Sequence, residues 1–329
     1  MGTLWNTYAF FVLYADIDKF DHTKYTLEYD KLPVMDRWIL SRMNSMIKDV
    51  DNFLANYQIP EASRVLQEFV DDMSNWYVRR TRERFWAKGM EQDKVNAYMT
   101  LHTVLVTLSK VAAPMIPFMT EAIYQNLVRT NDASAPESIH LCSFPECDET
   151  MIDAELEADM ALVLEASTLA RAARNASNIK NRQPLAKLYI KAERHLNDYY
   201  KAILAEELNV KEVEEISDAS GYISYTFKPQ LKTLGPKFGK LIGEIRNALM
   251  SLDGGAAKAQ LDKDGYVSIT VSTGEIQLGA EDLLIETKQT EGFESVSDNN
   301  IIGALDTHIT PELLEEGFVR EIISKLKTM

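Results

Sequence analysis

Arginine and aromatic residues are concentrated in one stretch, Asn75 to Trp86, which reads NWYVRRTRERFW. Guanidinium groups make paired hydrogen bonds to phosphate, and exposed aromatic rings stack on unpaired nucleobases. A helix that carries both residue types could therefore bind a single-stranded region of a nucleic acid. The formal net charge of the chain is −15, so this cationic stretch is a local feature within an acidic protein.

The same arginines admit a second interpretation. At 100° per residue, Arg80 and Arg84 continue the apolar stripe that runs from Leu66 to Tyr77, while Arg79 and Arg82 lie on the other side. An arginine on such a stripe is either buried with a carboxylate partner or displayed where the helix leaves the core. The alternative to nucleic-acid binding is thus a helical scaffold whose arginines pair with its own carboxylates. The candidate binding residues here are Trp76, Tyr77, Arg79, Arg80, Arg82, Arg84 and Trp86.

A second basic segment covers residues 171–195, RAARNASNIKNRQPLAKLYIKAERH, with seven Lys or Arg residues and one Glu. It lies where a predicted helix passes into a predicted strand. Arg171 and Arg174 are three positions apart and so share a helix face. Gln183 precedes Pro184 and so favours an extended backbone at the exit of the loop. An ordinary surface loop is the alternative interpretation. The candidate binding residues here are Arg171, Arg174, Lys180, Arg182 and Gln183.

The other polar residues do not form a recognisable active site. His140, Cys142 and Cys147 supply three soft metal ligands without a fourth and without a common zinc spacing. The remaining histidines are scattered and suggest no catalytic triad. We therefore expect no catalytic residue, no metal and no cofactor in this chain.

Long amphipathic helices must position the first basic segment. Apolar residues recur with a helical period over residues 35–57, 60–88 and 95–112, and again after Pro117. Short connections between such helices predict an antiparallel bundle. A loop over residues 130–150, with two prolines, marks the end of this bundle.

The second half of the chain predicts a small α+β structure. A helix over residues 152–176 precedes alternating strands and helices, and a last helix starts at Thr310-Pro311. Gly235, Gly239 and Gly243 recur every fourth residue, which suits close helix packing. The predicted fold is mainly α, a bundle followed by small α+β domains. The expected divisions are a lead-in at 1–32, the bundle at 33–150, a junction unit at 151–230 and a last unit at 231–329, whose final helix is unfinished.

Composition restricts the setting of this protein. With 46% hydrophobic residues the chain can build real cores, and two cysteines provide no disulfide framework, which fits a reducing cytosol. The apolar start LWNTYAFFVLYA lacks a positive n-region, and Asp16 ends it before it could span a bilayer. We expect a cytoplasmic protein that is not inserted in a membrane.

The two basic segments resemble a known family. NWYVRRTRERFW resembles the signature helix of the anticodon-binding domain of isoleucyl-tRNA synthetases, and APMIPFMTEAIYQNL resembles a Pro-x-x-Pro turn and helix shared by the related class I synthetases. LPVMDRWILSRMN is similar to the start of that domain. The motif R-x-x-R-x4-I-K-x-R-Q-P-L of isoleucyl enzymes is matched at Arg171, Arg174, Ile179, Lys180, Arg182, Gln183, Pro184 and Leu185. The likeness covers essentially the whole chain.

The resemblance implies a function for both segments. The bundle would dock along the anticodon stem and loop of isoleucine tRNA, with its arginines on phosphates or bases and its aromatic rings stacking or bracing the helix. The junction residues Arg171, Arg174, Lys180 and Arg182 would hold the tRNA beside the bundle, and we expect a monomer. The α+β tail would contribute contacts at the wobble position.

The departures from the family also carry information. The family's catalytic signatures, H-I-G-H and K-M-S-K-S, are absent, so the resemblance implies a piece that lacks the catalytic region and is inactive alone. A valyl or leucyl enzyme is the runner-up within the same branch. The R-R-x-R run and the sequence IKNRQPL favour the isoleucyl enzymes.

Overall fold

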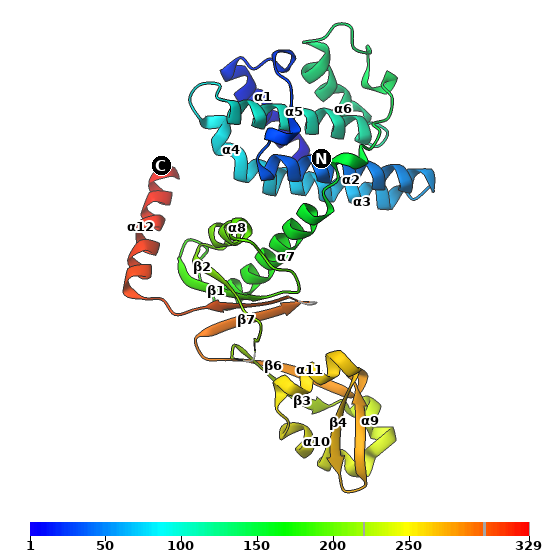
Figure 1. Cartoon of the computed structure of the whole chain (residues 1–329), viewed down its shortest axis with the longest axis vertical. Helices are drawn as coiled ribbons and strands as arrows, with labels where there is room; N and C mark the ends of the chain where they lie inside the picture. Colours follow the sequence, from blue (N-terminus) through cyan, green and yellow to red (C-terminus); the bar gives the residue numbers. More distant parts are fainter. Residues whose placement is uncertain (220, 299–300, 329) are drawn as a thin grey trace. The chain divides into compact units, whose positions relative to one another are not determined.

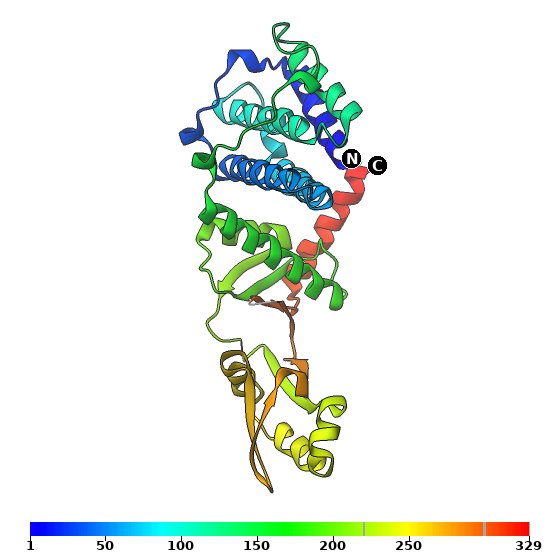
Figure 2. The same cartoon turned by 90° about the vertical axis from the view of Figure 1, so that its right-hand side faces the viewer.

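The computed structural model describes residues 1–219, 221–298 and 301–328 and divides into two compact units, Met1–Ala158 and Asp159–Met329. The first unit is helical, and the second combines helices with small sheets (Figures 1 and 2). The predicted fold class, a helical bundle followed by small α+β parts, is confirmed. The boundary between the units falls within a helix, α7 (Ala154–Ala176).

The first unit is an array of long helices, of which α2, α3 and α5 lie side by side (Figures 1 and 2). Pro60 occupies the first turn of α3, where its missing N–H costs no hydrogen bond. The path from α3 to α4 is one continuous helical run, because the connecting segment η3 is a π-helix. The helices are α1 (Gly2–Asp18), α2 (Val34–Ala55), α3 (Ile59–Asp71), η3 (Asp72–Val78), α4 (Arg79–Trp86), α5 (Gln92–Ala112), α6 (Pro117–Tyr124) and the π-helical η4 (Gln125–Arg129).

Helix α1 belongs to this unit, although the sequence suggested a separate lead-in. The ring of Phe11 packs edge-on against Tyr98 of α5, with 5.9 Å between the ring centroids. Lys94, only 3% exposed, forms an ion pair with Asp18 at the end of α1, with 2.6 Å between Nζ and Oδ2. The apolar and charged contacts together fix α1 on α5, so residues 1–32 complete the bundle.

The second unit contains a four-stranded sheet in the order β2-β1-β8-β7. Strands β1 (Leu185–Lys191) and β2 (Val210–Glu215) are parallel, which requires a crossover, and α8 (Asp198–Leu208) provides it. Strands β7 (Phe293–Asp298) and β8 (Ile301–Asp306) form an antiparallel pair, and β8 also pairs with β1. The sheet thus joins segments from both sides of the division expected at residue 230.

The segment between β2 and β7 builds its own core. Strand β3 (Ile223–Pro229) pairs with β6 (Leu283–Gln289), β4 (Tyr266–Val271) pairs with β5 (Gly274–Gly279), and three helices cover them. Phe227, Leu249 and Val267 are among the buried residues at its centre. The three helices are α9 (Leu231–Phe238), α10 (Ile242–Met250) and α11 (Gly254–Asp264).

The glycines of this segment behave differently from the sequence expectation. A Cβ atom at Gly235, Gly239 or Gly243 would meet no described atom within 4 Å, so their spacing does not reflect close helix packing. The close approach occurs instead at Gly254, the first residue of α11. A Cβ there would lie 1.9 Å from the backbone oxygen of Tyr225 in β3, so only glycine fits this contact.

Candidate nucleic-acid interface

The basic stretch NWYVRRTRERFW follows the end of η3 and all of α4. The wider π-helical turns of η3 change the rotation of the side chains relative to an uninterrupted α-helix, and such segments are frequent at functional sites. Tyr77, Thr81 and Phe85 are buried at intervals of four residues. The opposite side of the helix presents Arg79, Arg82 and Trp86.

Arg84 is directed inward and bound by carboxylates. Its Nη1 and Nη2 atoms donate to the two oxygens of Asp36 at 2.7 and 2.8 Å, and its Nε donates to Asp93 at 3.0 Å. The Arg84 side chain is 16% exposed and that of Asp36 is fully buried. Burial disfavours the charged guanidinium, but the hydrogen bonds and charge of Asp36 outweigh it and raise the pKa of Arg84. Of the two options for an arginine on the apolar stripe, Arg84 follows the buried one.

Tyr77 completes the same buried network. Its hydroxyl donates to Oδ1 of Asp36 at 2.8 Å, so one carboxylate of α2 holds two side chains of the η3–α4 run. Burial, and then the charge of Asp36, raise the pKa of Tyr77 well above its usual range. Tyr77 and Arg84 were both expected to contact RNA; in the structure they fasten the helix to α2. Sequence reasoning missed Asp36, whose signal is an acid placed beside the apolar stripe of α2.

The outward face of α4 carries stacked cations and rings. The guanidinium of Arg82 lies 5.3 Å from the ring centroid of Trp86, which is 50% exposed. Arg79 lies 5.7 Å from the ring of Trp76, and its Nε donates to the backbone oxygen of Asn75 at 2.8 Å. No carboxylate in the described part of the chain lies within ion-pair distance of Arg82. Arg80 is partly buried.

The second basic segment also divides into buried and exposed members. Arg174 is 2% exposed, and its guanidinium donates to the backbone oxygens of Lys180, Gln183 and Leu208 at 3.0, 2.6 and 2.6 Å. Burial lowers the pKa of Arg174 to about 10, since the described residues offer it carbonyl dipoles and no carboxylate. Arg174 was expected at the RNA surface; it instead ties the junction loop to the end of α8.

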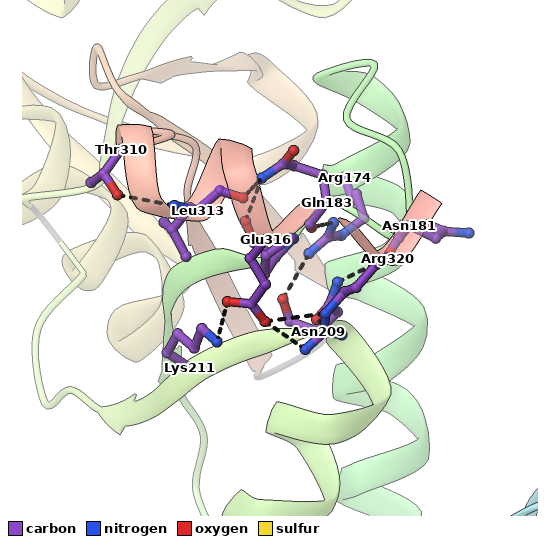
Figure 3. A network of polar contacts seen from close by, with 10 residues as sticks. Arg174, Asn181, Gln183, Asn209, Lys211, Thr310, Leu313, Glu316 and Arg320 are labelled. Carbon is purple, nitrogen blue, oxygen red and sulfur yellow. Dashed lines mark hydrogen bonds and ion pairs between the residues drawn. The ribbon is translucent and has the colours of Figure 1, made fainter. Parts of the chain in front are cut away.

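The other junction residues are nearer the surface. Arg171 is ion-paired with Glu207. The side chains of Lys180 and Arg182 are 80% and 58% exposed. The amide of Gln183 donates to the backbone oxygen of Leu313 at 2.7 Å, so Gln183 is engaged by the last helix, α12 (Pro311–Thr328) (Figure 3).

The described residues contain neither a membrane-spanning helix nor a cluster of metal ligands. None of their helices combines the length and apolar character that crossing a membrane requires. Among them, no group of three or more His, Cys, Asp and Glu residues is arranged to hold a metal ion. His140, Cys142 and Cys147 therefore form no such group.

Known proteins are similar to this chain over both basic segments. Residues 36–192 match the family described as the anticodon-binding domain of tRNA ligase. Isoleucine–tRNA ligases from Clostridium acetobutylicum, Clostridium tetani and Bacteroides fragilis are 48%, 45% and 36% identical to the chain. Each alignment covers 100% of this chain but only 32%, 32% and 29% of the relative. The chain thus spans about a third of the length of the curated relatives it matches.

These matches confirm the resemblance drawn from the two basic segments. The arginine- and tryptophan-bearing helix and the junction loop both lie within the residues that match the anticodon-binding domain of tRNA ligase. Along its whole length the chain is similar to isoleucine–tRNA ligases.

Proposed function

We propose that this chain is the tRNA-binding segment of an isoleucine–tRNA ligase and that it binds the anticodon stem and loop of isoleucine tRNA. One observation carries the proposal: the outward face of α4 displays Arg82 stacked over the half-exposed ring of Trp86, without a carboxylate partner among the described residues. Arg79 lies on the same helix face, three residues earlier.

The chemistry of this face suits RNA. A guanidinium that lies over an aromatic ring keeps its N–H edge available for phosphate, and an exposed ring accepts an unpaired base. Stacking of one base on an aromatic side chain contributes about 1–3 kcal/mol, with little dependence on the base. The acidic remainder of the chain repels nucleic acid, so binding is confined to such cationic faces.

Two alternatives would explain the same arginine-rich helix differently. A valyl or leucyl enzyme would use the same kind of domain, but the relatives named above are isoleucine–tRNA ligases. A scaffold with internally paired arginines is favoured by Arg84, which Asp36 and Asp93 neutralise. Arg82 supports RNA binding instead, because a scaffold gives no reason for an exposed cation beside an exposed tryptophan.

In this proposal the complete protein attaches isoleucine to its tRNA with ATP, in the cytoplasm and as a monomer. The segment itself contributes RNA contacts and needs no catalytic residue, metal or cofactor. Lys180 and Arg182 would extend the contact to a second cationic site.

The test is a titration of the chain with a transcript of isoleucine tRNA at several salt concentrations. Arg82→Ala should weaken binding and reduce the slope of log affinity against log salt by about one unit. Arg64→Ala is the matched control, since Arg64 is an exposed arginine of α3 outside the stretch 75–86. Equal affinity for a transcript with an exchanged anticodon would contradict base recognition, and equal effects of both substitutions would contradict the proposed face.

A further inference from the structure

Helix α12 is fastened to the junction by polar contacts on several residues (Figure 3). Gln183 of the loop donates to the backbone oxygen of Leu313 at 2.7 Å. Lys211 Nζ lies 2.6 Å from Oε2 of Glu316, and Arg320 Nη1 donates to Oδ1 of Asn209 at 2.7 Å. The helix therefore contacts both the loop after α7 and the turn before β2.

A glycine permits the closest part of this contact. A Cβ atom at Gly317 would lie 2.3 Å from Oε1 and 2.8 Å from Cδ of Gln183. With any larger residue at position 317, the Gln183 amide, which is the far end of a flexible side chain, would have to move away from this position. Gly317 thus allows the loop to seat directly on α12.

The loop is held from its other side by Arg174. Its guanidinium binds the backbone oxygens of Lys180 and Gln183, which bracket Arg182. Because the backbone at both ends of this short segment is fixed, the side chains of Lys180 and Arg182 project from a defined position. The helix and the buried arginine together present these two cations.

Glu321 of α12 faces both exposed cations. Its carboxylate oxygens lie 3.9 Å from Nζ of Lys180 and 3.7 Å from Nη1 of Arg182. Glu321 follows Gly317 by four residues, so both lie on the helix face that meets the loop. One carboxylate therefore partly neutralises the two junction residues that remain most exposed.

We propose that Glu321 competes with RNA phosphate for Lys180 and Arg182 and so lowers the affinity of the junction for RNA. This inference rests on the proposed function, because it concerns regulation of the same tRNA contact. Exposed ion pairs contribute little free energy, so a phosphate can displace Glu321. The carboxylate attenuates binding at the junction without blocking it, and it leaves the face of α4 to dominate.

The experiment compares Glu321→Gln with Glu315→Gln in the 329-residue chain, using a transcript of isoleucine tRNA. Glu315 is an exposed acid of the same helix that is not paired with the loop, so its substitution removes the same charge elsewhere. Glu321→Gln should bind about two- to five-fold more tightly. Its salt slope should steepen by up to about one unit, which a change in helix stability would not produce.

A cycle with Lys180→Ala/Arg182→Ala completes the test. In that background the gain from Glu321→Gln should disappear, since the cations that it releases are absent. An affinity of Glu321→Gln equal to that of wild type or of Glu315→Gln would overturn the competition while leaving the proposed function intact. A gain that persists without Lys180 and Arg182 would also overturn it. Absence of tRNA binding by the wild-type chain would overturn the proposed function, and this inference with it.

Discussion

The two arginine-rich segments use their buried arginines in different ways. Arg84 in the first unit meets a buried carboxylate, which accepts two hydrogen bonds from its guanidinium. Arg174 in the second unit is more enclosed, yet it binds backbone oxygens and has no carboxylate partner among the described residues. In each segment, one cation that could have reached RNA holds the structure that presents its neighbours.

The comparison shows how burial divides a cluster of like charges. A buried cation is tolerated only when carboxylates or oriented dipoles replace its hydration. Once that is satisfied, Arg84 can anchor a helix and Arg174 can anchor a loop. The residues left for an external anion are the neighbours that lie at the surface, such as Arg82 in the first segment and Lys180 in the second.

The largest effect is expected for Asp36→Ala. This change leaves the Arg84 guanidinium largely buried without its main partner and removes the acceptor of the Tyr77 hydroxyl. Loss of one member of a buried ion pair costs about 3–5 kcal/mol of folding free energy. Urea unfolding would measure the loss of folding free energy. Hydrogen exchange would show whether the loss is located in α2 and α4. A loss below about 1 kcal/mol would show that the pair is solvated and would remove the first half of the comparison.

Arg174→Met tests the other side of the comparison, in which a buried arginine is held by backbone carbonyls. Methionine fills similar space but leaves the carbonyls of Gln183 and Leu208 without this donor, at about 1–3 kcal/mol for each buried orphan, while the Lys180 oxygen keeps its bond from the Gln183 N–H. Because the buried charge is removed at the same time, we expect a net loss of about 2 kcal/mol. Hydrogen exchange of β1 would report it. A variant as stable as wild type would mean that these carbonyls find water.

Acid should destabilise the first unit through the buried His102. Burial, and then the neighbouring His22, lower the pKa of His102 to about 4, whereas an unfolded histidine titrates near 6.5. Between these values the unfolded state binds a proton that the folded state refuses, so the first unit loses stability as pH falls from 6.5 towards 4. The loss from this group is at most about 3 kcal/mol. Arg174 stays charged over the same range and contributes no such slope.

The histidine contribution can be isolated with a matched pair of variants. His102→Gln should flatten the pH dependence of urea unfolding in the first unit, while His140→Gln, at an exposed position of the same unit, should leave it unchanged. Parallel pH profiles for the two variants would assign the acid sensitivity to carboxylates instead.

The smallest effect concerns RNA affinity at the junction. Lys180→Ala/Arg182→Ala should weaken binding of isoleucine tRNA less than Arg82→Ala does, because Glu321 already offsets part of the junction charge. Fluorescence titration at fixed salt compares the variants directly. A stronger effect at the junction would reverse the order of the two sites.

Much of the bundle could be predicted from the sequence, because its helices are long and their apolar period is regular. The π-helical turns of η3 escaped prediction, since a change from four to five residues in hydrogen-bond spacing leaves the composition unaltered. Helix α9 was not among the predicted elements, and Pro236, a residue type that ordinarily interrupts a helix, lies inside it. Strand β6 and the pairing of β1 with β8 depend on contacts between distant segments.

The candidate site could be predicted as a region but not residue by residue. Arginine and tryptophan content located both segments, and the family resemblance assigned them a role. The helical period placed Arg84 on the apolar stripe and Arg82 on the other side, but it left open whether Arg84 is buried with a carboxylate or displayed. That choice depends on Asp36, which lies 48 residues before Arg84 in the chain.

The most direct test of the account compares the salt dependence of isoleucine-tRNA binding by wild type, Arg82→Ala and Tyr77→Phe. Arg82→Ala should have a lower affinity and a slope reduced by about one unit. Tyr77→Phe should keep an unchanged slope, because its lost hydroxyl is buried against Asp36. A reduced slope for neither variant, or the same reduction for both, would contradict the assignment of RNA contact to the outward face of α4.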